Sequence, residues 1–430
     1  MNVKDTFRKI IIAIIEWEAI LVLKKYKPRI IAVTGSVGKT SSKDAIYAVM
    51  STAFFVRKSE KSFNSDIGVP LAILGCSNAW NNPFLWVKNI IEGLLLIALK
   101  NHYPKWLVLE VGADRPGDIK NICRWLKPDI TVITTIPDVP VHVEFFSSPE
   151  KVVEEKECLV RALKPEGTLV LNHDDLKVRG FAQKYSHPTL TFGFEDGARF
   201  QASREVFDIG KRQTSFRVDS NGSSVPVVIT GALGRQHIYP VLAAFAVGAS
   251  QGLDMASMAG AFEHYESPPG RMKILDGVRK SIIIDDSYNS SPAALAEALS
   301  VLKGITPSGT GRKYAVLGDM MELGTYSIEE HRKAGALVAT GADRLVTVGI
   351  RALDAHKEAL RTGMDKRYVF HFEDSLKAAD KVRDMLDKGD VMLVKGSQSM
   401  RMERIVKAAI TDKRDAEKLL VRQDKEWLRR

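Results

Sequence analysis

The chain has 430 residues, enough for two or three domains that each bury a core, and its 45% hydrophobic and 27% charged residues are typical of a globular protein. Its three cysteines, Cys76, Cys123 and Cys158, stand far apart, which argues against a disulfide framework or a zinc site and fits a reducing cytoplasm. The net charge of +10 indicates either an acidic partner, such as a nucleotide or an anionic membrane, or a basic surface without a partner. No RNA-binding or helix-turn-helix pattern is present, so nucleic acid is not an expected partner.

Residues 1–28 are predicted to form one apolar helix, which ends where Pro28 forces an extended backbone. Its apolar run is interrupted by Glu16 and Glu18 and lacks a small-residue cleavage site, unlike a signal peptide. The run is also shorter than the roughly 20 residues that a membrane span requires. We therefore expect a cytoplasmic protein.

Short β-branched runs then alternate with helical stretches, which predicts an α/β fold with a mostly parallel sheet covered on both faces. The candidate strands of the first half are residues 29–33, 106–111, 129–135 and 168–172. From about 189 to 230, short alternating strands with Gly and Asn turns predict a small antiparallel meander in the same domain, before an Ala-rich helix at 239–251.

A turn at residues 267–270 precedes the second half, where strands and helices alternate again. The strands expected there are residues 281–286, 313–319, 344–349, 367–372 and 390–396. This rhythm predicts a Rossmann-like domain. We divide the chain into the helix 1–28, a central domain 29–267 with an insertion at about 78–104, a C-terminal domain 268–410, and a charged tail 411–430 expected to be an exposed, solvated helix.

The segment TGSVGKTSSKD, residues 34–44, connects the first strand to a helical pattern. Its glycines let backbone N–H groups curl around an anion, and the helix N-terminus adds partial positive charge. Lys39 would reach the terminal phosphates of ATP, and the Thr40 hydroxyl would hold magnesium. The loop residues predicted to bind ATP are Gly35, Ser36, Gly38, Lys39, Thr40 and Ser41.

With this loop the chain begins to resemble the Mur ligases, and the resemblance extends over residues 29–405. Further stretches follow in the family's order: SFNSDIGVP (62–70), LEVGADRPGDI (109–119), VHVEFFSSPEKVVEEKECL (141–159), PPGRMKIL (268–275), IIDDSYNSSP (283–292), LGDMMELG (317–324) and LVKGSQSMRMERIV (393–406). Each stretch alone is weak, whereas their order is specific. Within the family, the resemblance is closest to members that add D-alanyl-D-alanine to a cell-wall precursor peptide.

This resemblance implies an ATP-dependent ligase that forms an amide bond through an acyl phosphate, in a central P-loop ATPase domain and a C-terminal domain. The implied catalytic residues are Lys39, Lys156, His142 and Arg271, and the implied ligands of two magnesium ions are Thr40, Glu110, His142 and Lys156. Lys156 would act as a carbamate, because carbamylation turns a cation into an anionic ligand. Asn172, Arg271, Asp286 and Asn289 complete the implied ATP site, and Asn64, Asp319 and Lys395 are implied to contact the substrate.

Two of these residues have simpler interpretations. Lys156 lies in the sequence EEKE, which by itself is typical of a solvated helix face. Arg271 could form an interdomain salt bridge instead of contacting phosphates. A related ligase with another acceptor, or a non-catalytic nucleotide-binding module, are the alternative functions, although a module would not need a second metal site.

The sequence differs from the family pattern at its start and in the nucleotide site. A single helix precedes the phosphate loop, where the family has a domain that grips a UDP-sugar, so we expect that domain to be absent. GRQHIYPVLAA (234–244) replaces the family's G-x-H-N-x-x-N-A-x-A-A, with Gln236 and His237 at the first pair and Pro240 at the second Asn. Different adenine contacts are therefore expected.

The insertion contains an apolar helix at residues 83–100, whose polar residues Lys88, Asn89, Glu92 and Gly93 form one narrow stripe. At about 1.5 Å per residue the helix is short for a membrane span. It could pair with residues 7–23 in a membrane interface at the inner face of the membrane, form an ordinary buried pair, or be a dimer seam. We otherwise expect a monomer.

Overall fold

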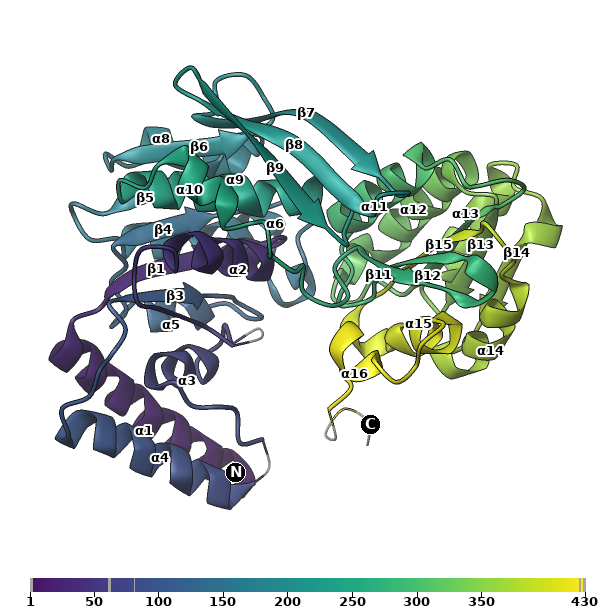
Figure 1. Cartoon of the computed structure of the whole chain (residues 1–430). Coiled ribbons are helices and arrows are strands. Elements are labelled where there is room, and N and C mark those ends of the chain that lie inside the picture. Colours follow the sequence, from purple (N-terminus) through teal and green to yellow (C-terminus); the bar gives the residue numbers. More distant parts are fainter. Residues whose placement is uncertain (1–2, 61–62, 81, 425–426, 428–430) are drawn as a thin grey trace.

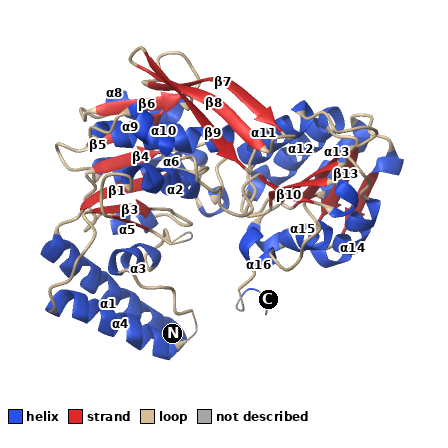
Figure 2. Cartoon of the chain, viewed as in Figure 1, coloured by secondary structure: helices blue, strands red, loops and turns tan. Residues whose placement is uncertain are grey.

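The computed structural model describes residues 3–60, 63–80, 82–424 and 427 (Figure 1). The start of the predicted first helix (1–2) and part of the predicted tail (425–426 and 428–430) lie outside the described residues. Two sheets, each wrapped by helices, lie side by side (Figures 1 and 2). We call the part built on the first sheet the first lobe and the part built on the second sheet the second lobe.

Within the described residues, the first sheet has nine strands in the order β2-β3-β1-β4-β5-β6-β7-β8-β9. They are β1 (Arg29–Thr34), β2 (Val56–Lys58), β3 (Trp106–Glu110), β4 (Ile130–Ile133), β5 (Thr168–Asn172), β6 (Thr189–Gly193), β7 (Phe200–Asp208), β8 (Gln213–Ser220) and β9 (Ser223–Thr230). Neighbours from β2 to β7 are parallel, and only the β7–β8 and β8–β9 pairs are antiparallel. The prediction that the meander starts at 189 is therefore wrong. β6 follows two short helices that cross over from β5, and such a crossover returns the chain parallel.

Alternate strand residues of the first sheet enter separate cores. In β1, Ile31 and Val33 pack beneath one layer of helices, whereas Ile30 and Ala32 pack beneath the other. The first layer is α2 (Lys39–Met50), α9 (Ile238–Ser250) and α10 (Met255–Gly260). The second is α3 (Gly68–Leu74), α5 (Asp118–Ile122), α6 (Pro149–Arg161), α7 (Leu176–Arg179) and α8 (Phe181–Lys184). Burial on both faces explains the continuous apolar runs in the sequence.

The second sheet has six strands among the residues described, in the order β10-β11-β15-β12-β13-β14. They are β10 (Lys273–Asp276), β11 (Ile282–Asp286), β12 (Lys313–Gly318), β13 (Arg344–Val348), β14 (Val369–Phe372) and β15 (Val391–Lys395), and only β10 is antiparallel to its neighbour. One face is covered by α11 (Pro292–Gly304), α12 (Ser327–Gly341) and α13 (Leu353–Arg361), the other by α14 (Ser375–Met385) and α15 (Glu403–Ala409). The predicted fold class is confirmed.

Two helices form a further layer outside the first lobe. α1 (Val3–Tyr26) and α4 (Pro83–Ala98) lie side by side (Figure 1). They run in the same direction, because Lys25 Nζ near the end of α1 donates to the carbonyl oxygens of Leu96 and Ile97 near the end of α4, at 3.0 and 2.9 Å. Among the residues that the structure describes, no helix combines the length and the hydropathy needed to cross a lipid bilayer.

The tail packs against the second lobe. In residues 411–424 of the tail, which the structure describes, one short helix forms, α16 (Ala416–Leu419), and Leu420, Arg422 and Gln423 are buried. Arg422 Nη1 lies 3.1 Å from Glu403 Oε2 and 3.1 Å from the Ser287 carbonyl oxygen. The prediction of an exposed, solvated tail is therefore wrong for Leu420, Arg422 and Gln423, because this arginine pairs with a buried carboxylate.

Candidate active site

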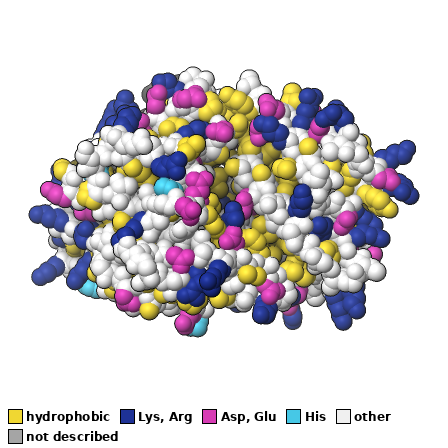
Figure 3. All heavy atoms as spheres, turned by 90° about the horizontal axis from the view of Figure 1, so that it is seen from above, with side chains coloured by type: hydrophobic (Ala, Val, Ile, Leu, Met, Phe, Trp, Pro, Cys, Tyr) yellow, Lys and Arg dark blue, Asp and Glu magenta, His cyan; other side chains and the backbone are white. Residues whose placement is uncertain are grey.

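A cavity of about 1940 Å³ opens where the two lobes meet. Its first-lobe wall holds the phosphate loop and the carboxyl ends of β3, β4 and β5, and its second-lobe wall holds the start of α11 and the turn at 321–322. In the view from above, most Lys and Arg side chains lie toward the ends and edges, and acidic and apolar side chains cross the middle, where the lobes meet (Figure 3). Ligands of open α/β sheets bind at the carboxyl ends of strands, so this cavity is the candidate active site.

The phosphate loop is fixed in shape before any ligand arrives. A Cβ at Gly35 would lie 1.9 Å from Thr134 Oγ1, so only glycine fits there. Gly38 precedes α2 with a φ of 86°, in the left-handed region that favours glycine. The backbone N–H of Ser36 donates to the Thr135 carbonyl oxygen at 2.7 Å, which ties the loop to the end of β4. The N-terminus of α2 is thereby presented to the cavity, as an anion-binding helix requires.

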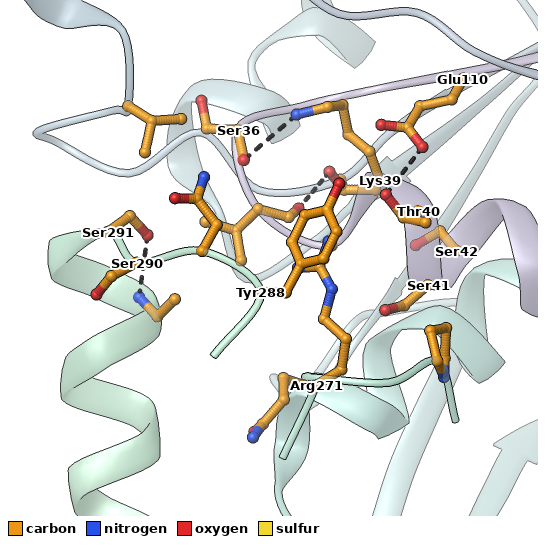
Figure 4. Close-up of a pocket in the computed structure, with 18 of the residues that line it drawn as sticks. Ser36, Lys39, Thr40, Ser41, Ser42, Glu110, Arg271, Tyr288, Ser290 and Ser291 are labelled. Carbon is orange, nitrogen blue, oxygen red and sulfur yellow. Dashed lines mark hydrogen bonds between the residues drawn. The ribbon is translucent and has the colours of Figure 1, made fainter. Parts of the chain in front are cut away.

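Lys39 lies inside this loop, with its Nζ 3.4 Å from the Ser36 carbonyl oxygen (Figure 4). Burial lowers the pKa of Lys39; the Glu110 and Asp114 carboxylates oppose the shift, and the Arg271 guanidinium of the second lobe adds to it. The nearby carboxylates compensate the Lys39 ammonium only in part, so an anion that binds beside it would stabilise its charged form. The position therefore suits a polyphosphate.

Glu110 at the end of β3 connects the loop to Asn64 on another part of the cavity wall. Its side chain is buried and accepts a hydrogen bond from Thr40 Oγ1 at 2.9 Å (Figure 4). It accepts another from Asn64 Nδ2 at 3.0 Å. A carboxylate and a hydroxyl are the hard oxygen donors that magnesium prefers. The chemistry of Thr40 and Glu110 thus fits the predicted magnesium site.

His142 bridges the lobes. Its Nδ1 lies 2.5 Å from Glu322 Oε2 in the second lobe, and its Nε2 lies 3.5 Å from Asp114 Oδ1. This contact lowers the pKa of Glu322. Both residues have a left-handed backbone, with φ of 67° and 64°, a conformation that costs energy in non-glycine residues. A metal ion bound at Nε2 of His142 would leave the Nδ1 contact with Glu322 in place.

Lys156 on α6 is 3% exposed and is not part of the cavity lining. Burial lowers its pKa to about 7; the Lys39 ammonium contributes, and the carboxylates of Glu155 and Asp114 oppose it. The solvated-face interpretation is wrong, because Glu155 and Glu157 are buried as well. An amine with this pKa is substantially neutral at pH 7, and the neutral form is the one that carbon dioxide carbamylates.

The second-lobe wall is held together by a buried ion pair. Lys395 Nζ donates to Asp286 Oδ2 at 2.6 Å and to the Asn289 carbonyl oxygen at 3.0 Å. Burial raises the pKa of Asp286, and Lys395 opposes the shift. The Arg271 guanidinium stacks on the Tyr288 ring at 4.1 Å (Figure 4). Lys395, predicted to contact substrate, thus anchors the segment that positions Arg271 and Asn289 in the cavity.

Of the predicted site residues, Gly35, Lys156 and Asp319 are not in the cavity lining, whereas the others are. Asp319 is buried, and its carboxylate accepts the backbone N–H of Ala352 at 2.7 Å. Its backbone oxygen accepts the N–H of Ser397 at 3.0 Å. Asp319 therefore shapes the turn that carries Glu322 instead of facing the cavity.

The segment that differs from the family pattern forms a further part of the wall. Gln236, His237 and Pro240 all line the cavity, and burial lowers the pKa of His237 to about 4. Asn172 donates to Thr135 Oγ1 at 3.0 Å and accepts the N–H of Asp174 at 3.1 Å. Tyr239 then donates its hydroxyl to Asp174 Oδ2 at 2.8 Å. This hydrogen-bonded wall lies beside the phosphate loop, where a nucleoside would extend from its phosphates.

Sequence reasoning missed Glu322, Trp80 and the tail residues 420–424, all of which line the cavity. The tail carried one usable signal: Leu419 and Leu420 interrupt its charged run. For Glu322 the only signal was its place in LGDMMELG. Its pairing with His142 depends on how the lobes meet, which no local pattern encodes.

Two family models match the chain. The Mur ligase middle domain matches residues 87–248, which include Glu110, His142 and Lys156, and the glutamate ligase domain of Mur ligases matches residues 270–398, which include Arg271 and Lys395.

Similar proteins of known name agree with these models. UDP-N-acetylmuramoyl-tripeptide–D-alanyl-D-alanine ligase of Bacillus subtilis is 29% identical over 391 residues, 90% of this chain and 77% of that protein. The Escherichia coli ligase of the same name is 25% identical over 88% of this chain and 76% of that protein. A crystal structure of a MurF ligase from Thermotoga maritima in complex with ADP has a TM-score of 0.75 at 25% identity, covering 95% of this chain and 84% of that one. A pseudomurein peptide ligase from Methanothermus fervidus, at 19% identity and a TM-score of 0.63 over 89% and 79% of the two chains, shares the fold.

Proposed function

The chain belongs to the Mur ligase family, and from this we propose that it is an ATP-dependent ligase that joins D-alanyl-D-alanine, or a similar amine, to the peptide carboxylate of a UDP-muramoyl tripeptide. One observation carries the proposal. Cations from both lobes, Lys39 and Arg271, approach each other across one cavity closely enough that Arg271 lowers the pKa of Lys39. A site of this kind is suited to a polyphosphate that reacts between two lobes.

The reaction requires activation, because a carboxylate is a poor electrophile. Transfer of the γ-phosphoryl group of ATP to the carboxylate gives an acyl phosphate and ADP. The amine then attacks the acyl carbon, and the tetrahedral intermediate releases inorganic phosphate and a proton. Phosphoryl transfer depends on positioning and charge neutralisation, which Lys39 from the loop and Arg271 from the second lobe would provide.

Thr40 and Glu110 would hold magnesium beside the phosphates, with Asn64 fixing the orientation of the carboxylate. When bound, magnesium neutralises charge on the transferred phosphoryl group. His142 and Lys156 would hold a second ion. For Lys156, the neutral amine adds to the carbon of carbon dioxide and loses a proton, which leaves an anionic N-carboxylate. Its pKa of about 7 and its proximity to the Lys39 charge support this reaction, because an ammonium in that place is repelled.

The test is a product assay. The purified protein is incubated with magnesium, ATP and UDP-N-acetylmuramoyl-tripeptide, with and without D-alanyl-D-alanine, and products are followed by mass spectrometry. A pentapeptide product with one ADP per product, absent with Lys156→Ala, is the expected result. ADP release that depends on another acceptor would retain the ligase and replace the substrate. The absence of ATP turnover with every acceptor would favour a non-catalytic nucleotide-binding module.

A further inference from the structure

Helix α4 exposes many apolar side chains and buries part of its polar stripe, whereas Lys88 and Glu92 of that stripe stay at the surface. Asn89 and Gly93, from its polar stripe, are buried, and Asn89 Nδ2 donates to the Ser77 carbonyl oxygen at 2.8 Å. Phe84, Val87 and Ile91 follow each other at helical spacing and are exposed, with Phe84 at 83%. A surface helix of a water-soluble domain normally buries its apolar face. Here the apolar face is directed outward.

Helix α1 extends this outward apolar surface. Ile10 and Trp17 are exposed on it, and Leu94 and Leu95 of α4 and the following Leu99 are exposed as well. Both helices lie outside the layer that covers the first sheet (Figure 1). We call the exposed apolar side chains of α1 and α4 the outer face. Contiguous exposed apolar groups of this kind mark an interaction surface.

A polar group lies within the packing of α1 and α4, whose buried apolar side chains, such as Ile15 and Trp86, belong to one hydrophobic cluster. Glu18 of α1 is completely buried, and neither carboxylate oxygen has a hydrogen-bond partner in the part of the chain that the structure describes. A Cβ added to Gly93 would lie 2.3 Å from Glu18 Oε2, so the glycine makes room for this carboxylate. Polar groups between helices and apolar groups outside are characteristic of helices that face lipid.

Positive charge borders the outer face at the end where α1 and α4 both finish. The exposed basic residues there are Lys24, Lys25, Lys27, Lys100 and Lys105, whereas Arg29 beyond them pairs with Asp129 at 3.9 Å. The sequence has no Asp or Glu within 24–29 or 99–105. Basic residues next to an apolar helical face are complementary to a surface of anionic lipid headgroups.

We propose that the outer face docks the enzyme on an anionic membrane surface, with α1 and α4 lying in the interface. α4 has 16 residues and is therefore about 24 Å long, which suits lying in the headgroup region better than spanning a bilayer. Lys88 distinguishes lipid from a second copy of the chain, because it is exposed on α4, where its ammonium lies 3.5 Å from the Glu92 carboxylate. A dimer seam would bury this ion pair among apolar side chains, whereas at a membrane the Lys88 stem lies in the apolar layer and its ammonium reaches the headgroups.

This inference goes beyond the proposed reaction and does not depend on it. The two features are nevertheless connected, because the segment that leads into α4 lines the active-site cavity through Asn78 and Trp80. A docked enzyme would hold this wall of its cavity near the lipid surface.

The experiment is flotation of the full-length protein with vesicles of phosphatidylcholine alone and of phosphatidylcholine with an equal part of phosphatidylglycerol. We expect flotation with the anionic vesicles, weakened by added salt. The Phe84→Gln/Ile91→Gln double variant should reduce the bound fraction by about ten-fold or more, since two side chains that would insert are lost. Both side chains are exposed, so the fold should be unaffected, which circular dichroism checks.

The matched control is Ile350→Gln, because Ile350 is 83% exposed, as Phe84 is, but lies in the second lobe. This variant should float like the wild type. Two results would overturn the proposal: wild-type protein that stays at the bottom of the gradient with anionic vesicles, or a double variant that floats unchanged. A dimer in analytical ultracentrifugation that the double variant dissociates, without flotation, would assign the outer face to a second copy instead. ATP turnover measured in parallel without vesicles tests the ligase separately.

Discussion

Glu110 beside the phosphate loop and Glu18 between α1 and α4 are both almost completely buried. Glu110 accepts hydrogen bonds from Thr40 and Asn64. Glu18 has no such partner within the described residues, and burial raises its pKa to about 7. The comparison separates two uses of a buried acid. Hydrogen-bond donors hold the Glu110 carboxylate in one orientation beside the phosphate loop, whereas Glu18 is stable in its position chiefly as the neutral acid.

The Glu110→Gln substitution should have the largest effect and should fall on activity. The amide keeps the shape of the side chain but loses its negative charge, so the proposed magnesium site beside Thr40 loses its anionic ligand. We expect ATP turnover to fall about 10²- to 10³-fold, with a small change in thermal unfolding. Steady-state ADP release and circular dichroism melting measure the two quantities. A fully active Glu110→Gln enzyme would remove this residue from the proposed metal site.

A third buried carboxylate, Glu403, sharpens the comparison because two arginines neutralise it. Arg401 Nε lies 2.5 Å from Glu403 Oε1, and Arg422 Nη1 lies 3.1 Å from Glu403 Oε2. Arg422→Ala removes one of these partners and the tail's anchor, and should lower the free energy of unfolding by about 3 kcal/mol. Arg414→Ala is the control, since its ion pair with Asp412 is exposed and should contribute almost nothing. Urea unfolding of both variants measures the difference. Equal midpoints would show that the tail does not stabilise the second lobe.

Glu18→Gln should stabilise the protein at pH 8, whereas the substitutions above lower its activity or its stability. An acid with a folded pKa near 7 and an unfolded pKa near 4.5 keeps its proton in the folded state while the unfolded state releases it. The wild type should therefore lose stability as the pH rises from about 4.5 to 7, by about 3 kcal/mol at most. The variant cannot ionise, so it should lack this loss and be about 2 kcal/mol more stable than the wild type at pH 8.

Urea unfolding from pH 4 to pH 8 tests this expectation, with Glu154→Gln on the exposed side of α6 as the control. The control should follow the wild-type curve, because its carboxylate stays in water. A Glu18→Gln variant less stable than the wild type at pH 8 would mean that the ionised carboxylate has a stabilising partner. The ligase reaction should be unaffected by Glu18→Gln, since this residue lies outside the cavity.

The sequence predicted those features that depend on local pattern. Strands buried on both faces appear as apolar runs, and the phosphate loop combines glycines with Lys39 between a strand and a helix. Features that depend on contacts between distant segments were missed or wrong. Helical periodicity located the stripe of Asn89 and Gly93 but not its direction, because inward polarity requires the partner Glu18. The prediction for the tail was wrong because a run of charged residues is typical of a solvent-exposed segment, whereas Arg422 pairs with the buried Glu403, 19 residues earlier.

Asn64→Ala should have the smallest effect. It tests whether Glu110 needs both of its hydrogen-bond donors, Asn64 and Thr40. The substitution removes the 3.0 Å hydrogen bond from Asn64 Nδ2 and leaves the one from Thr40. Losing one hydrogen bond to a charged group costs about 1.5 kcal/mol, so ATP turnover should fall about ten-fold, mainly in kcat if the carboxylate loses its orientation. Asn121→Ala, an exposed asparagine on α5, is the control and should leave turnover unchanged. An unchanged Asn64→Ala enzyme would show that Thr40 alone holds Glu110, and that the difference between Glu110 and Glu18 depends on a single hydroxyl.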